Sequence, residues 1–171
     1  MDVTIVCHTE YGLVKGREVV YRKSALEGVT RGVRSMVSTA GRYRAKVTFA
    51  VMPETVWSVP GEMTHEIGLH VHPGWEEHTC GGEVVPVGDR YLRERCGIQG
   101  SSSVLPDYTF KEQLALIRAG KDRIEDVLYV TPEVFVAGRW SINDDTVKAL
   151  VQSGFTHDCS AEGSIRRLPA D

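Results

Sequence analysis

The sequence has no long apolar run, no close cysteine pair and no large excess of charge of either sign. No segment comes near the roughly 20 apolar residues of a membrane-spanning helix, so no membrane association is expected. The opening MDVTIVCHTE lacks a basic segment before a long apolar core, which predicts no secretory signal and a cytoplasmic protein. With 20 Lys and Arg against 23 Asp and Glu, the chain lacks the basic surface typical of nucleic-acid binders.

Cysteine is sparse and widely spaced. The four cysteines are Cys7, Cys80, Cys96 and Cys159, and none of them forms a Cys-x-x-Cys pair, which argues against a cysteine zinc site. Without a secretion signal we expect reduced thiols rather than disulfides. The length of 171 residues and the 42% apolar content predict one globular domain over residues 1–171.

Short runs rich in β-branched residues alternate with helical patterns along the chain. The predicted strands are Asp2–Cys7, Lys46–Met52, Glu66–His72, Glu133–Ala137 and Phe155–Cys159. Helices are predicted to start at Ser24, Thr109 and Ser141, and to end near Gly41, Leu128 and Gly154. This alternation predicts an α/β fold with parallel strands, either a doubly wound sheet or a partial barrel. Residues 8–23 and the long segment 73–108 show no period and are expected to be loops, and the tail SIRRLPAD is expected to fray.

Polar side chains collect where the predicted strands end, which is where parallel sheets place ligands. His70 and His72 are two positions apart on one strand, so both imidazoles face the same side. Imidazole suits Zn, Ni, Cu and Fe, and Glu10 at the end of the first strand could complete a site. Two alternatives stay open: the histidines form ordinary hydrogen bonds, or Glu10 pairs with Lys15 or Arg17.

Further candidates follow the other strand ends. His8 and Glu10 are candidates at the end of the first strand, where the Glu10 carboxylate is a metal ligand, a general base or a cap of the following loop. Asp158 is likewise either a ligand or general base, or a simple turn residue. Trp75 and Trp140 either stack on a flat ligand such as a sugar ring or pack at the rim of the core. His65 and His78 are expected to lie on exposed loops.

Four segments in order carry a resemblance to a known family. They are KVTFAVMP, HEIGLHVHPGW, LPDYTFKEQLALIRAGKDRIEDVL and VFVAGRWSINDDTVKALVQSGFTHDCS. Over residues 2–160 the succession resembles the polysaccharide deacetylase superfamily, carbohydrate esterase family four, also called NodB-like domains. The resemblance implies a distorted (β/α) barrel, usually of seven strands. It also implies metal-dependent removal of acetyl groups from N-acetylated sugars, or cleavage of a related C–N amide bond.

The resemblance also implies a set of site residues, some of which depart from the family. In the family an Asp near the end of strand one is the base, and here His8 stands in its place, while Glu10 keeps the acidic end of the motif. His70 matches the first His of a His-x-x-x-His pair and His72 substitutes for the second, because Gly74 stands at the fourth position. The Arg that normally steadies the base would fall at Val136.

These matches give a metal site at Glu10, His70 and His72 for a divalent cation, with zinc favoured over cobalt or nickel. His8 and Asp158 are the candidate catalytic residues, and Trp75, Arg139 and Trp140 the candidate substrate-binding residues. The expected partner is a carbohydrate or small amide.

The departures leave two interpretations open: an active hydrolase with His8 as a rewired base, or a non-catalytic carbohydrate-binding or scaffold protein on the same fold. Five strands are few for this barrel. A trimmed barrel, a homo-oligomer that covers the open edge, and a fragment are all compatible with them.

Overall fold

Five parallel strands form the centre of the structure, a computed structural model that describes residues 4–10, 13–15, 18–20, 25–61, 64–74, 76–80, 83–160 and 166–168. The strands are β1 (Val6–Thr9), β4 (Thr48–Val51), β5 (Glu66–Val71), β8 (Val134–Ala137) and β9 (His157–Asp158). The five strands expected from the sequence are therefore confirmed, and β4, β5, β8 and β9 are each somewhat shorter than predicted. Strand β1 continues past its predicted end at Cys7 to Thr9, and its predicted start at Asp2 lies outside the described residues. A two-residue strand, β10 (Arg166–Arg167), adds to β9 in the antiparallel sense.

The order of strands in this sheet, β1-β4-β5-β8-β9-β10, is the same as their order in the chain. Right-handed crossovers that always step in one direction bring every connection to the same face of the sheet. That winding is typical of a (β/α) barrel and differs from a doubly wound sheet, which reverses direction. Among the described residues the sheet is open, with β1 at one edge and β10 at the other.

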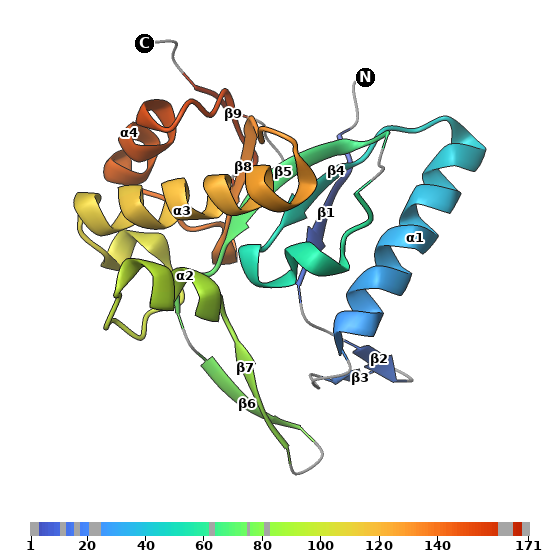
Figure 1. Cartoon of the computed structure of the whole chain (residues 1–171), viewed down its shortest axis with the longest axis horizontal. Coiled ribbons are helices and arrows are strands. Elements are labelled where there is room, and N and C mark those ends of the chain that lie inside the picture. The colour runs from blue at the N-terminus through green and yellow to red at the C-terminus, as the bar shows by residue number, and fades with distance from the viewer. Residues whose placement is uncertain are drawn as a thin grey trace.

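In the described residues, four α-helices accompany the sheet: α1 (Ala25–Tyr43), α2 (Arg90–Cys96), α3 (Phe110–Leu128) and α4 (Asp144–Gln152). Figure 1 shows α3 crossing in front of β5 and β8, with α1 and α4 on either side. The apolar core lies between the sheet and these helices, because Phe49, Val51, Leu69, Val71 and Phe135 belong to one buried cluster with the apolar positions of α3 and α4.

The alternation along each strand leaves a second, inward face. Ala50, His70 and Val136 occupy the positions between core residues and are fully buried without belonging to the helix-facing cluster. Strand register brings these inward positions side by side, since His8 pairs with Ala50, Ala50 with Gly68, and His70 with Val136. His8 and His70 therefore lie on the side of the sheet that faces away from the helices.

Two segments expected to be loops contain regular structure. Residues 8–23 hold the short hairpin of β2 (Leu13–Lys15) and β3 (Glu18–Val20). Residues 73–108 hold the β6–β7 hairpin (Glu76–Cys80 and Glu83–Val87), helix α2 and the 3₁₀ turn η2 (Leu105–Asp107). The β6–β7 hairpin extends below the rest of the molecule in Figure 1.

Several predicted boundaries were wrong for local reasons. Helix α4 is capped by Asn143, whose side chain accepts a hydrogen bond from the backbone N–H of Thr146, and not by Ser141. Helix α1 continues past Gly41 to Tyr43. Of the tail expected to fray, the described residues 166–168 are held in place, because Leu168 is buried and its N–H donates to the Thr156 carbonyl, and the rest of the tail lies outside the described residues.

Other expectations concern single side chains. His65 is half-buried rather than exposed, because its Nδ1 accepts from the Val47 N–H and its ring packs edge-on against Phe49. His78 lies on strand β6, and its side chain is outside the described part. Within the described side chains, Cys7, Cys96 and Cys159 are free thiols, and burial raises the pKa of each.

In the part of the chain that the structure describes, no helix combines the length and the apolar character needed to cross a membrane.

Candidate metal centre

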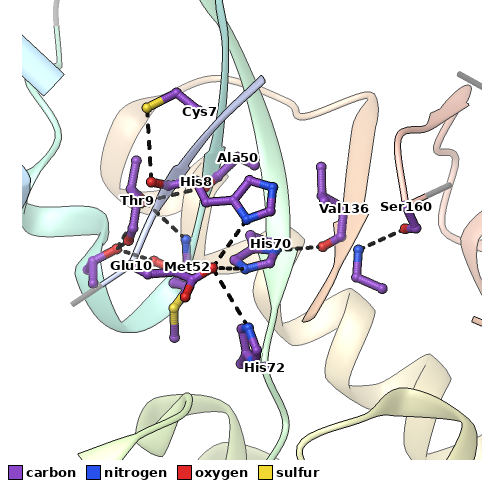
Figure 2. A network of polar contacts seen from close by, with 12 residues as sticks. Cys7, His8, Thr9, Glu10, Ala50, Met52, His70, His72, Val136 and Ser160 are labelled. Atoms are coloured by element: carbon purple, nitrogen blue, oxygen red, sulfur yellow. Dashed lines mark hydrogen bonds and ion pairs between the residues drawn. The ribbon is translucent and has the colours of Figure 1, made fainter. Parts of the chain in front are cut away.

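Three imidazoles converge on one carboxylate oxygen at the carboxyl ends of β1 and β5 (Figure 2). Glu10 Oε1 lies 2.9 Å from His70 Nε2, 3.2 Å from His8 Nδ1 and 3.8 Å from His72 Nε2. The structure thus brings together the three predicted ligands and the predicted proton acceptor His8. The ligand atoms of His8, Glu10 and His70 all lie within 4.8 Å of one another.

The position of Glu10 and His8 depends on the residue between them. Thr9 is buried, and its carbonyl accepts a 2.7 Å hydrogen bond from the Thr55 hydroxyl on the turn η1 (Pro53–Ser58). The Met52 N–H also donates to Thr9 Oγ1. Because alternate residues of an extended segment point to opposite sides, fixing Thr9 toward η1 directs His8 and Glu10 together toward the inward face.

A small residue, Ala50, leaves room for the imidazoles of His8 and His70 to approach each other. β4 lies between β1 and β5, so His8 and His70 come from strands that are not neighbours. Ala50 occupies the inward position of β4 that pairs with His8, and across it the two rings approach to 4.4 Å between centroids. A larger side chain at this position would separate the two rings.

His70 is fully buried and its ring is oriented by β8. The Val136 carbonyl lies 2.9 Å from His70 Nδ1 and can only accept, so Nδ1 carries the proton. In the neutral imidazole Nε2 then presents its lone pair to the Glu10 carboxylate, which is repulsive unless a proton or a cation lies between them. A backbone acceptor behind the ring is also the usual way in which a metal-ligating His is held.

The electrostatics of the cluster favour a charged Glu10 carboxylate and a neutral His70 imidazole. Burial raises the pKa of the Glu10 carboxyl, but its polar contacts with His70, His72 and His8 outweigh burial and lower that pKa overall. Burial lowers the pKa of His70 despite its bond to Glu10. An anionic carboxylate oxygen in contact with imidazole nitrogens is a donor set that fits a divalent cation.

His72 approaches from beyond the end of β5 and packs against the start of the turn η3 (Gly138–Trp140). Its ring lies 4.9 Å from that of His70 in an edge-on arrangement. A Cβ added to Gly138 would come 2.7 Å from Cγ and Nδ1 of His72, so glycine leaves the space that this ring occupies.

Of the three residues predicted to bind substrate, Trp140 lies beside the Glu10 cluster. Trp140 is 61% exposed and its ring centroid lies 6.1 Å from that of His8, so it stands at the rim of the site. Arg139 donates from Nε to the Ser103 hydroxyl. Both residues have φ of 52°, a left-handed conformation that costs roughly 1 kcal/mol or more in non-glycine residues. Trp75 lies outside the described residues.

Asp158 is not brought to the cluster. It pairs in register with Phe135, whose side chain belongs to the helix-facing core, so the alternation places Asp158 on the face opposite His70. Its Oδ1 accepts from the backbone N–H and the hydroxyl of Ser160, and that hydroxyl also accepts from the Ala137 N–H. This arrangement ties the end of β9 to β8.

Sequence reasoning missed the residues that support the donors: Thr9, Ala50, the Val136 carbonyl and Gly138. Thr9 and Ala50 adjoin the donors in the chain or in register, but neither has a side chain that suggests a role in binding. The contribution of Val136 is a backbone atom, which the identity of its side chain does not reveal. Gly138 could have been noticed as a glycine directly after a buried strand.

Comparisons with solved structures identify proteins of similar shape. A protein from Mycobacterium smegmatis assigned as a polysaccharide deacetylase has a TM-score of 0.51 at 14% identity, over 91% of this chain and 49% of its own. A de-N-acetylase from Aggregatibacter actinomycetemcomitans has a TM-score of 0.51 at 14% identity, over 80% and 62%. A deacetylase domain from Bordetella bronchiseptica has a TM-score of 0.51 at 11% identity, over 80% and 63%.

The chain spans between about half and under two-thirds of the length of these structures. No protein-family model matches the sequence, and no curated protein matches it. The likeness is therefore one of architecture, and it agrees with the open, singly wound parallel sheet described above. The chain has the α/β fold of polysaccharide deacetylases, with the sheet of its described residues left open.

Proposed function

We propose that this protein is a metal-dependent hydrolase that removes acetyl groups from N-acetylated sugars or cleaves a related C–N amide bond. The observation that carries the proposal is the convergence of imidazole nitrogens from His70 and His72 on Glu10 Oε1, at 2.9 and 3.8 Å. These three residues would hold a divalent cation, with zinc favoured because the set combines imidazole with a carboxylate. The architecture shared with deacetylases supports the same chemistry.

A divalent cation in such a site polarises an amide carbonyl and lowers the pKa of a water. The protein's own residues set the conditions for that chemistry. The carbonyl of Val136 keeps the proton of His70 on Nδ1, which leaves Nε2 free to bind. The exposed ring of Trp140 beside His8 offers a surface on which a sugar ring could stack, which suits a carbohydrate substrate.

The test combines zinc content with turnover. The purified chain should bind zinc in a one-to-one ratio and release acetate from short chitin oligomers, and a chelator should abolish the release. His70→Ala should lose both zinc and activity. His65→Ala is the matched control, because it removes a half-buried imidazole that bonds to Val47 instead of Glu10. An absence of zinc binding by the wild-type chain would contradict the proposal.

A second candidate is a carbohydrate-binding protein without catalysis. Two observations favour it: an imidazole, His8, adjoins Glu10 where an acidic base is expected from the family, and the inward position of β8 next to His70 is the aliphatic Val136. This candidate predicts that chitin oligomers bind equally well to the wild type and to His70→Ala, with no acetate released by either.

A further inference from the structure

We propose that His8 is a ligand of the cation rather than the proton acceptor, so that three imidazoles and one carboxylate form the centre. This inference rests on the proposed metal site and extends it. It changes the role of the first strand, which then supplies two ligands, and it strengthens the preference of the site for zinc over harder cations.

The first support is the spacing of the donor atoms. Four donors arranged around a zinc ion at about 2.0–2.1 Å are roughly 3.3 Å apart. His8 Nδ1 lies 3.2 Å from Glu10 Oε1, which is close to that spacing, and His70 Nε2 lies at 2.9 Å. His72 Nε2 is the most distant of the three at 3.8 Å. His8 is thus placed at least as well for binding the cation as His72, which the sequence predicted as a ligand.

The second support is the compactness of the group. His8, Glu10 and His70 form a set whose ligand atoms are mutually within 4.8 Å, and the His8 and His70 rings approach to 4.4 Å across the small side chain of Ala50. Nδ1 of His8 is directed at the Glu10 oxygen that His70 and His72 also approach, as Figure 2 shows, so this nitrogen lies where a shared cation would bind.

The third support is the source of the residue. His8 and Glu10 are two positions apart on one extended segment, and His70 and His72 repeat that spacing. Two such pairs that face each other supply four donors from the same side of the sheet. Three nitrogens make the set poorer in hard oxygen ligands, so it favours Zn, Ni or Cu over Mg or Mn.

The experiment measures metal binding directly. Zinc affinity is determined by competition with a chromophoric chelator for the wild type, His8→Ala, His70→Ala and the control His65→Ala. We expect His8→Ala to weaken zinc binding by at least about 100-fold, beyond the 10–100-fold typical of losing an outer-shell partner. His65→Ala should match the wild type, and excess Mg²⁺ should not displace zinc.

A second measurement uses only the wild-type chain, so it does not depend on whether a variant folds. Pulsed electron paramagnetic resonance on the wild-type chain loaded with one Cu²⁺ counts coordinated imidazoles. Three imidazoles would support the inference, whereas two would overturn it. The inference would also be overturned if His8→Ala bound zinc as tightly as the wild type. The proposed function would then still stand, provided that His70→Ala loses zinc. If the wild type itself binds no zinc, both the inference and the proposed function fail.

Discussion

The ring of His72 occupies space that any side chain on Gly138 would need, since a Cβ there would lie 2.7 Å from the ring. We predict that Gly138→Ala moves His72 away from Glu10 and weakens zinc affinity about 10–100-fold, as loss of an outer-shell support typically does. Gly41→Ala is the control, because a Cβ at Gly41 meets nothing within 4 Å. Chelator competition measures both variants, and equal zinc affinities would contradict the prediction.

The small side chain of Ala50 leaves the space across which the rings of His8 and His70 approach each other. We predict that Ala50→Leu separates the two rings and lowers zinc affinity, and that overpacking costs about 1–3 kcal/mol of unfolding free energy. Val51→Leu enlarges the next residue of β4, which faces the helices instead. Urea unfolding and zinc titration should show both variants destabilised but only Ala50→Leu impaired in binding.

Asn143 begins helix α4 by accepting from the Thr146 N–H at 2.9 Å. We predict that Asn143→Ala lowers the free energy of unfolding by about 1 kcal/mol, the usual effect of losing an N-cap. Ser141→Ala should cost less, because the Ser141 hydroxyl donates to the Arg139 carbonyl outside the helix. Urea unfolding measures both, and a larger loss for Ser141→Ala would restore Ser141 as the cap.

Asp89 is a buried carboxyl whose pKa is raised by burial from its ordinary 3.8 to about 7. Between these values the folded state holds a proton that the unfolded chain has released. Its contribution to stability is therefore full below about pH 4 and is lost as the pH rises to about 7.

We predict that Asp89→Asn, which does not titrate, flattens this dependence, and that the pH trends of the two proteins diverge by about 4 kcal/mol across the window. Urea unfolding of the metal-free chain between pH 4 and pH 8 measures the difference. Asp145→Asn is the control, since Asp145 is exposed and pairs with Lys148. Parallel curves for wild type and Asp89→Asn would contradict the assignment.

The sequence was sufficient to predict the central sheet, because its middle strands β4, β5 and β8 consist almost entirely of buried residues and are rich in apolar side chains. It was less informative for the β2–β3 and β6–β7 hairpins, whose strands have three to five residues and depend on cross-strand pairing. Helix α2 carries readable signals that were overlooked: Asp89 as N-cap and Gly97, with φ of 66°, at the end.

The sequence can indicate which site residues share a face along one segment, but it cannot indicate which side chains meet between strands. A spacing of two predicts that His70 and His72 share a face. The meeting of His8 with His70 depends on the register of β1 against β4 and on the small size of Ala50. Neither can be read from a single segment, because a shift of one residue would turn His8 to the other face.

All four candidate donors lie between residues 8 and 72, whereas the groups that orient two of them, the Val136 carbonyl and Gly138, come from β8 and its turn. During synthesis the donors are thus made well before the strand that holds them in place. Strong metal capture should accordingly arise late in folding, when β8 docks beside β5, and a nascent chain that lacks this strand should bind a cation only loosely.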